Sequence, residues 1–145
     1  MTEEQIALAR RAVACKGFRW MPGMAGTDAL GVPFRCALTR HSGGIMVVAG
    51  MAVMVAHPDA LAHMFPDLTD PATLGCLLAL VRDAYGDPSL YVRLSDTTRS
   101  DGVRAWEALG WLDPSRSPDG RGGSWRGWGY ASEAEALVAA LEAVR

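Results

Sequence analysis

The stretch DPATLGCLLALVRDAYG, residues 70–86, contains a start signal, an apolar face and a stop signal for one helix. Asp70 stands before Pro71, which suits the first turn of a helix, and Gly86 follows the last periodic residue. Apolar side chains recur between these signals at helical spacing, at Leu74, Leu77, Leu78, Val81 and Tyr85. The pattern predicts a helix over 71–85 with one face in the core.

Helices at both ends of the chain have capping signals at their first residues. Ser132 and Glu135 have the spacing of a capping box, and an apolar run follows them. Thr2 and Gln5 repeat this spacing near the start of the chain, and Gly17 supplies the stop signal. A fourth, short helix is expected over 102–109 with a glycine after it.

The remaining periodic segments are typical of strands, and they lie at 32–38, 45–56, 90–94 and 125–130. Residues 45–56 carry no charge, which predicts a strand buried on both faces and either bulged or turned at Gly50. Strands follow one another without regular helix alternation. We therefore expect an α+β fold, with a largely antiparallel sheet of four to five strands packed against three to four helices.

Length and composition favour one domain over residues 1–145, with a flexible Pro/Ser/Gly/Arg loop at 113–124. The net charge of −2 argues against a protein that coats DNA or an anionic membrane. The uncharged run at 45–56 is shorter than the roughly 20 residues that span a bilayer. Three cysteines, an odd number, and an N-terminus without a targeting pattern lead us to expect a reducing cytoplasm.

Several of these segments resemble a family of small phage and prophage proteins. The resembling residues are 9–16, 20–24, 66–82, which read PDLTDPATLGCLLALVR, and 134–142, which read AEALVAALE. The order of helices and strands is also similar to the phage ABA sandwich domain, in which helices pack against a sheet. The resemblance implies a phage origin, a place in the host cytoplasm and a role in interaction with the host. It brings no catalytic residue to this chain.

The sequence contains no recognised catalytic or metal motif. His57 and His63, with Asp59 and Asp67, do not have a metal-ligand spacing, and no cysteine lies in a nucleophile signature. Phosphate-binding glycine loops and the GxSxG motif are absent from the sequence. We therefore predict no catalytic residue, no metal and no cofactor, while a small nucleotide hydrolase stays open as an alternative.

Arginine and aromatic residues form the best candidate site. All fourteen Lys and Arg residues except Lys16 are arginine, whose planar fork binds phosphate, while tryptophan rings stack on bases. Either Trp125 and Trp128 pack in the core, or they belong to a ligand pocket. The predicted ligand-binding residues are Arg19, Trp20, Arg99, Arg104, Trp125, Arg126, Trp128 and Tyr130.

These observations lead to a functional hypothesis. We expect a non-enzymatic phage accessory protein that antagonises a bacterial defence system, either by sequestering a nucleotide-like signal or by masking a host protein. A structural phage component is a further alternative. Methionines at 46, 51 and 54 either fill gaps in a core or line an adaptable interface. The second reading predicts a homo-oligomer built on residues 45–56.

Overall fold

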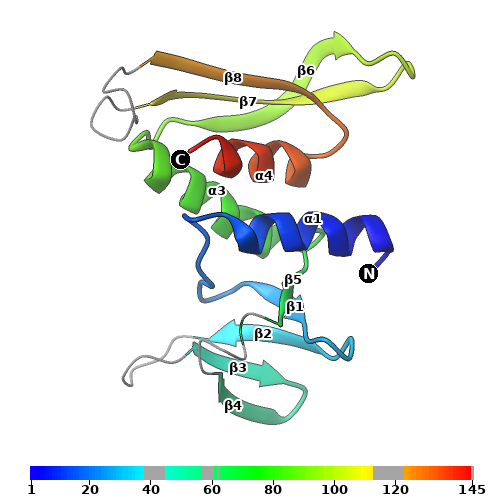
Figure 1. Ribbon diagram of the computed structural model, residues 1–145, viewed down its shortest axis with the longest axis vertical. Coiled ribbons are helices and arrows are strands. Elements are labelled where there is room, and N and C mark those ends of the chain that lie inside the picture. The colour runs from blue at the N-terminus through cyan, green and yellow to red at the C-terminus, as the bar shows by residue number, and fades with distance from the viewer. Residues whose placement is uncertain (38–44, 57–60, 62, 113–122, 145) are drawn as a thin grey trace. The chain divides into compact units, whose positions relative to one another are not determined.

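The computed structural model describes residues 1–37, 45–56, 61, 63–112 and 123–144, and these residues form an α+β fold (Figure 1). The helices are α1 (Glu3–Ala14), α3 (Pro71–Tyr85) and α4 (Glu133–Ala143). The strands are β1 (Ala25–Thr27), β2 (Pro33–Ala37), β3 (Ile45–Ala49), β4 (Ala52–Ala56), β5 (Phe65–Pro66), β6 (Tyr91–Thr98), β7 (Arg104–Leu112) and β8 (Gly123–Tyr130). The α+β class and the antiparallel pairing are confirmed.

The strands form two antiparallel sheets where the sequence predicted one. The chain divides into two compact units, one made of residues 1–14 and 19–76 and the other of residues 15–18 and 77–145. The first unit holds a sheet of order β4-β3-β2-β1-β5, and the second a sheet of order β6-β7-β8. That residues 1–145 form a single domain stays a prediction.

The predicted helix caps of α1 and α4 are confirmed. Gln5 donates its backbone N–H to Thr2 Oγ1 over 3.2 Å, and its side-chain oxygen accepts from the Thr2 N–H over 2.7 Å. At α4 the Glu135 N–H donates to Ser132 Oγ over 3.1 Å. The Glu135 carboxylate accepts from the N–H of Ala131, one residue before the cap. Both helices therefore begin where short-range chemistry predicts.

Helix α3 also begins and ends where the sequence predicts. Asp70 caps the first turn, and Gly86 takes a left-handed conformation with φ of 68° after the last turn. Two hydrogen bonds, from Gly86 N to Asp83 O and from Asp87 N to Arg82 O, form a Schellman motif. On the predicted face, the side chains at 77, 81 and 85 are buried, and those at 74 and 78 are half-buried.

The predicted strand at 45–56 is a hairpin. Ala49 pairs with Ala52, so the loop is Gly50-Met51, with φ of 58° at Gly50. A two-residue loop in which only the first residue has a positive φ is typical of a type II′ turn. This is one of the two turn types that hairpins favour. The turn expected at Gly50 is confirmed, but burial on both faces is wrong for residues 52–55. The turn folds the second half of the run back to the edge of the sheet, where its side chains are exposed.

The short helix expected over 102–109 is also wrong, because residues 104–109 belong to strand β7 and the two residues before them to a hairpin loop. Residues 99–103 form a hairpin loop in which Gly102 has a φ of 81° and Arg99 N donates to Val103 O over 2.8 Å. The adjacent Asp101 accepts the Val103 N–H through its side chain. Asp-Gly is a strong hairpin signal, and pairing with strands on both sides outweighs local helix propensity.

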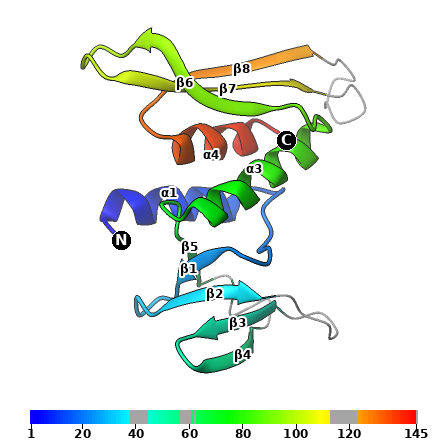
Figure 2. The ribbon, with the colours of Figure 1, turned by 180° about the vertical axis from the view of Figure 1, so that it is seen from behind.

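Helix α4 covers one face of the β6-β7-β8 sheet in the second unit (Figures 1 and 2). It is tied to α3 by the Tyr85 hydroxyl, which donates to the Ala140 carbonyl over 3.2 Å. Most of the predicted loop at 113–124 lies outside the described residues, and its last two residues, Gly123 and Ser124, belong to β8.

Two glycines give opposite expectations for the same substitution. A Cβ at Gly26 would lie 2.7 Å from Phe65 O and 2.9 Å from Trp20 Cη2. Gly26→Ala should therefore destabilise the protein by about 1–3 kcal/mol. Gly75 lies in α3 with open space around it, and Gly75→Ala should stabilise by about 0.5–1 kcal/mol.

Urea denaturation of the two variants beside the wild type measures both free energies of unfolding. Equal midpoints for Gly26→Ala and the wild type would contradict the close packing at β1.

Candidate functional site

Glu107 lies on the central strand of the second sheet and is bound by arginines from both neighbouring strands. Arg93 on β6 donates from Nε to Glu107 Oε1 over 2.6 Å. Arg126 on β8 donates to Oε2 from Nη2 over 2.6 Å and from Nε over 3.0 Å. The Glu107 side chain is 0% exposed, whereas those of Arg93 and Arg126 are 53% and 57% exposed. We call these three residues the Arg-Glu-Arg cluster.

The strand register places the cluster on one face of the sheet. Arg93 pairs directly with Glu107, and Arg126 pairs with Leu109, two residues along β7. Paired residues, and residues two apart on a strand, share a face. The opposite face includes Ala108, which is fully buried, and α4 packs on one face of this sheet. Arg93 and Arg126 are half-exposed on the face of the cluster, so we assign α4 to the other face and call the face of the cluster the open face.

An aromatic ring stands beside the cluster on the same face. Tyr91 lies two residues before Arg93, and the centroid of its ring is 5.8 Å from Arg93 Cζ. Its side chain is 44% exposed. A guanidinium and an exposed ring at this distance offer both charge and a stacking surface to one ligand.

The electrostatics keep Glu107 ionised. The hydrogen bond from Arg93 lowers the pKa of the Glu107 carboxyl most, burial opposes this, and the hydrogen bond from Arg126 lowers it further. The two guanidiniums and one carboxylate sum to a charge of +1. Because one carboxylate accepts from both arginines, it fixes the direction in which each of them points.

The structure brings only part of the predicted site to this face. Arg126 belongs to the cluster, and Arg104 is exposed on β7 opposite Thr98. Arg99 makes an ion pair of 3.3 Å with Asp101 in the hairpin loop. Tyr130 pairs with Trp106 and is half-buried.

The predicted tryptophans fall into two groups. Trp20, with Arg19, belongs to the first unit, where its buried ring lies 5.3 Å from the ring of Phe34. Trp20 is therefore a core residue of that unit. The backbone of Trp125 and Trp128 belongs to β8. Their side chains lie outside the described part of the structure, so the alternatives of core and ligand pocket both stay predictions.

Sequence reasoning did not select Tyr91, Arg93 or Glu107 as site residues. The alternation of Tyr91 and Arg93 along one strand is visible in the sequence. Their link to Glu107 needs β7 to be a strand, which the Asp-Gly pair at 101–102 indicates.

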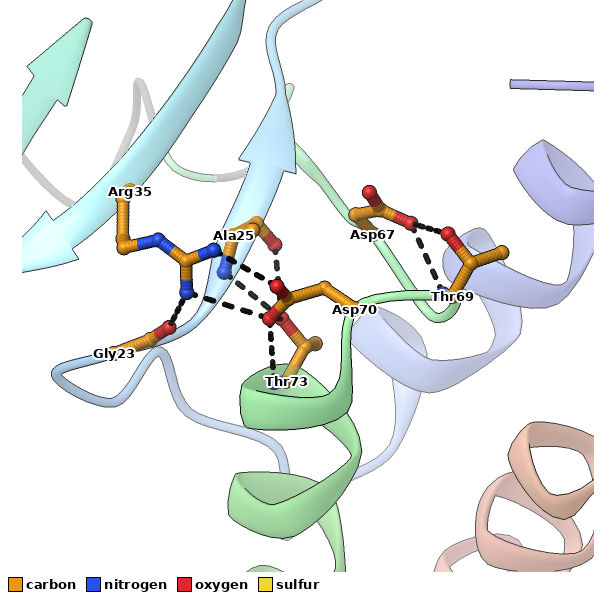
Figure 3. A network of polar contacts seen from close by, with 7 residues as sticks. All are labelled: Gly23, Ala25, Arg35, Asp67, Thr69, Asp70 and Thr73. Atoms are coloured by element: carbon orange, nitrogen blue, oxygen red, sulfur yellow. Dashed lines mark hydrogen bonds and ion pairs between the residues drawn. The ribbon is translucent and has the colours of Figure 1, made fainter.

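A second polar cluster lies in the first unit (Figure 3). Arg35 on β2 donates from Nη2 to Asp70 Oδ1 over 2.8 Å and from Nη1 to the Gly23 carbonyl. Asp70 Oδ2 accepts from the N–H and the hydroxyl of Thr73, over 2.8 and 2.9 Å. Thr73 Oγ1 in turn accepts the N–H of Ala25 on β1 over 2.8 Å. This cluster ties the start of α3 to two strands, which is a structural role.

Asp70 is strongly held as a carboxylate in this second cluster. The hydrogen bond from Arg35 is the largest influence and lowers the pKa of Asp70 from 3.8 to about 2, with smaller contributions from both donors of Thr73. The side chain of Asp70 is 16% exposed and that of Arg35 is 50% exposed. Part of the attraction is therefore screened by water.

Only some of the residues weighed as metal ligands are among those that the structure describes. His63 is exposed, while His57 and Asp59, two of the residues weighed as metal ligands, lie outside the described residues. Across the described ranges, no group of three or more His, Cys, Asp or Glu side chains is placed to hold a metal ion. No helix in this part of the chain has the length and apolar character needed to cross a membrane.

Comparison with protein-family models, with curated proteins and with solved structures finds no match to this chain.

The Arg35–Asp70 pair generates an expectation for acid stability. Between pH 3.8 and about 2 the unfolded carboxyl binds a proton that the folded one does not, so stability should fall as pH falls through this window. After allowance for screening, the loss should be about 1–2 kcal/mol. Asp70→Asn should lack this component. Urea midpoints against pH measure it, and parallel curves for the wild type and Asp70→Asn would refute it.

Proposed function

We propose that this protein acts by binding an anionic, nucleotide-like ligand on the open face of the β6-β7-β8 sheet. The observation that carries this proposal is the buried carboxylate of Glu107, which holds two half-exposed guanidiniums on one sheet face. Arg93 and Arg126 would contact the anionic group, and Tyr91 would contact a ring.

The cluster suits an anion because its arginines are oriented before a ligand arrives. A guanidinium carries five N–H groups, and Glu107 accepts two of those of Arg126. Guanidiniums bind phosphate oxygens in a bidentate manner, and ordering them in advance lowers the entropy lost on binding. Guanidinium groups are positively charged hydrogen-bond donors, so the cluster favours an anion over a cation.

Tyr91 directs the proposal toward a ligand with a flat ring. Stacking of a base on an aromatic side chain contributes about 1–3 kcal/mol. The exposed ring of Tyr91 and the guanidinium of Arg93 lie close together, so a single nucleotide can reach both.

Binding is favoured over hydrolysis by the state of Glu107. A general acid or base works best with a pKa near the working pH. The pKa of Glu107 is lowered instead, and both of its carboxylate oxygens are engaged by arginines. The nucleotide hydrolase alternative therefore draws no support from this carboxyl.

The biological setting rests on the resemblance to small phage and prophage proteins. We propose an accessory protein in the host cytoplasm that counters a bacterial defence system by sequestering a nucleotide-like signal. Masking of a host protein and a structural role in the phage are the alternatives.

Calorimetric titration with inorganic phosphate and with mono-, di- and cyclic nucleotides tests the proposal. Arg93→Ala and Arg126→Ala should each weaken nucleotide binding by about tenfold or more, since each removes a charge-assisted contact of about 1.5–3 kcal/mol. Tyr91→Ala should weaken the binding of nucleotides but not of inorganic phosphate. Arg10→Ala, which removes the same charge from the first unit, is the matched control and should bind like the wild type.

Absence of heat with every member of the panel would overturn the ligand proposal and favour masking of a host protein. An equal loss of affinity in Arg10→Ala would indicate non-specific attraction in place of a site on the sheet.

A further inference from the structure

Strand β4 is an edge strand with an apolar, exposed sequence. It is the last strand of the order β4-β3-β2-β1-β5 and reads Ala-Val-Met-Val-Ala over 52–56. Val53, Met54 and Val55 are each more than half exposed. Edge strands without charge, proline or a covering segment pair readily with another strand.

The β3–β4 hairpin determines which backbone groups of β4 point outward. Residues that flank a two-residue hairpin loop form a hydrogen-bonded pair, and hydrogen-bonded and non-hydrogen-bonded pairs then alternate. The register begins with Ala49 opposite Ala52, so residues 52, 54 and 56 bond to β3. The N–H and C=O groups of Val53 and Val55 therefore point away from β3.

We propose that β4 pairs antiparallel with β4 of a second copy of this chain, across a two-fold axis at Met54. The segment 52–56 reads the same in both directions. Under this symmetry each Val53 faces Val55 of the other copy, and Met54 faces Met54. The outward N–H and C=O groups of Val53 and Val55 then all find partners, in four intermolecular hydrogen bonds.

The side chains support the same pairing. Cys36, Val47 and Met54 follow one another across three paired strands on one face, and the first two are buried while Met54 is not. A second copy continues this apolar row across the axis and covers Met54. The methionine side chain adapts well to such a contact.

The arrangement closes at two copies. The other edge of the sheet is β5, which has two residues and includes Pro66, a residue without an N–H. A two-fold contact uses the same surface on both copies and leaves no second β4 edge for growth. The expected product is a dimer with a micromolar dissociation constant, because the contact is small.

Sedimentation of the 145-residue chain across micromolar concentrations tests its oligomeric state. The wild type should be a dimer in equilibrium with monomer. Met54→Asp places two like charges opposite each other and should raise the dissociation constant by at least about tenfold. Met51→Asp is the matched control, because Met51 lies in the hairpin loop outside the paired segment, and it should leave the dimer unchanged. Circular dichroism verifies that both variants are folded.

Disulfide cross-linking tests the register independently. Met54→Cys places two thiols at a non-hydrogen-bonded pair, where Cα atoms are about 4.5 Å apart, and should form an intermolecular disulfide readily. Val53→Cys and Val55→Cys face a valine and should cross-link much more slowly. A wild type that stays monomeric, a dimer insensitive to Met54→Asp, or faster cross-linking of Val53→Cys would each overturn the proposal. None of these results bears on ligand binding by the second unit.

Discussion

A carboxylate without exposed surface has to be paired, and Glu107 finds its partners on both neighbouring strands. Water screens part of the attraction, because both arginines are more than half exposed, but together they compensate the charge of a carboxylate that has no exposed surface. Because one partner belongs to β6 and the other to β8, a single side chain links the registers of two strand pairs. The same contacts orient the arginines on the open face. One buried carboxylate therefore both joins the three strands and orients the two arginines of this unit.

Helix ends were predictable because their chemistry is local. The caps at Thr2, Asp70 and Ser132, and the stop at Gly86, each involve side chains within a few residues of the helix terminus. Strand β7 was not predictable in the same way. Its Ala, Glu and Leu residues favour a helix when taken alone, and pairing with β6 on one side and β8 on the other makes it a strand.

The sequence predicted the types of residue in the candidate site better than it predicted which residues form it. Arginine and aromatic residues were expected, and Arg126 is among those found, but Arg93 and Glu107 meet only through the strand register. A regular ladder counted back from the Thr98–Arg104 pair would place Ser95 opposite Glu107. The register shift between Leu94 and Thr98 places Arg93 there instead. Trp20 was predicted to bind a ligand but is a core residue, with its ring against Phe34. A tryptophan suits a binding pocket and a core equally well, so its residue type does not distinguish the two. Residue types indicate a kind of site, and register decides which residues form it.

The irregular stretch of β6 has a consequence for changes in chain length. Leu94 pairs with Trp106 and Thr98 with Arg104, so residues 95–97 lie opposite Ala105 alone, an excess of two residues. Directly paired residues share a face, so Arg93 stays on the side of Glu107 despite this excess. Loss of two residues here would restore a regular ladder with Arg93 still opposite Glu107. Loss of one would leave two residues opposite Ala105, which a β-bulge accommodates, as β8 already does with the one-residue shift beside Glu107. Changes in the length of this short segment can therefore be absorbed locally, provided that the pairs on both sides of it are kept.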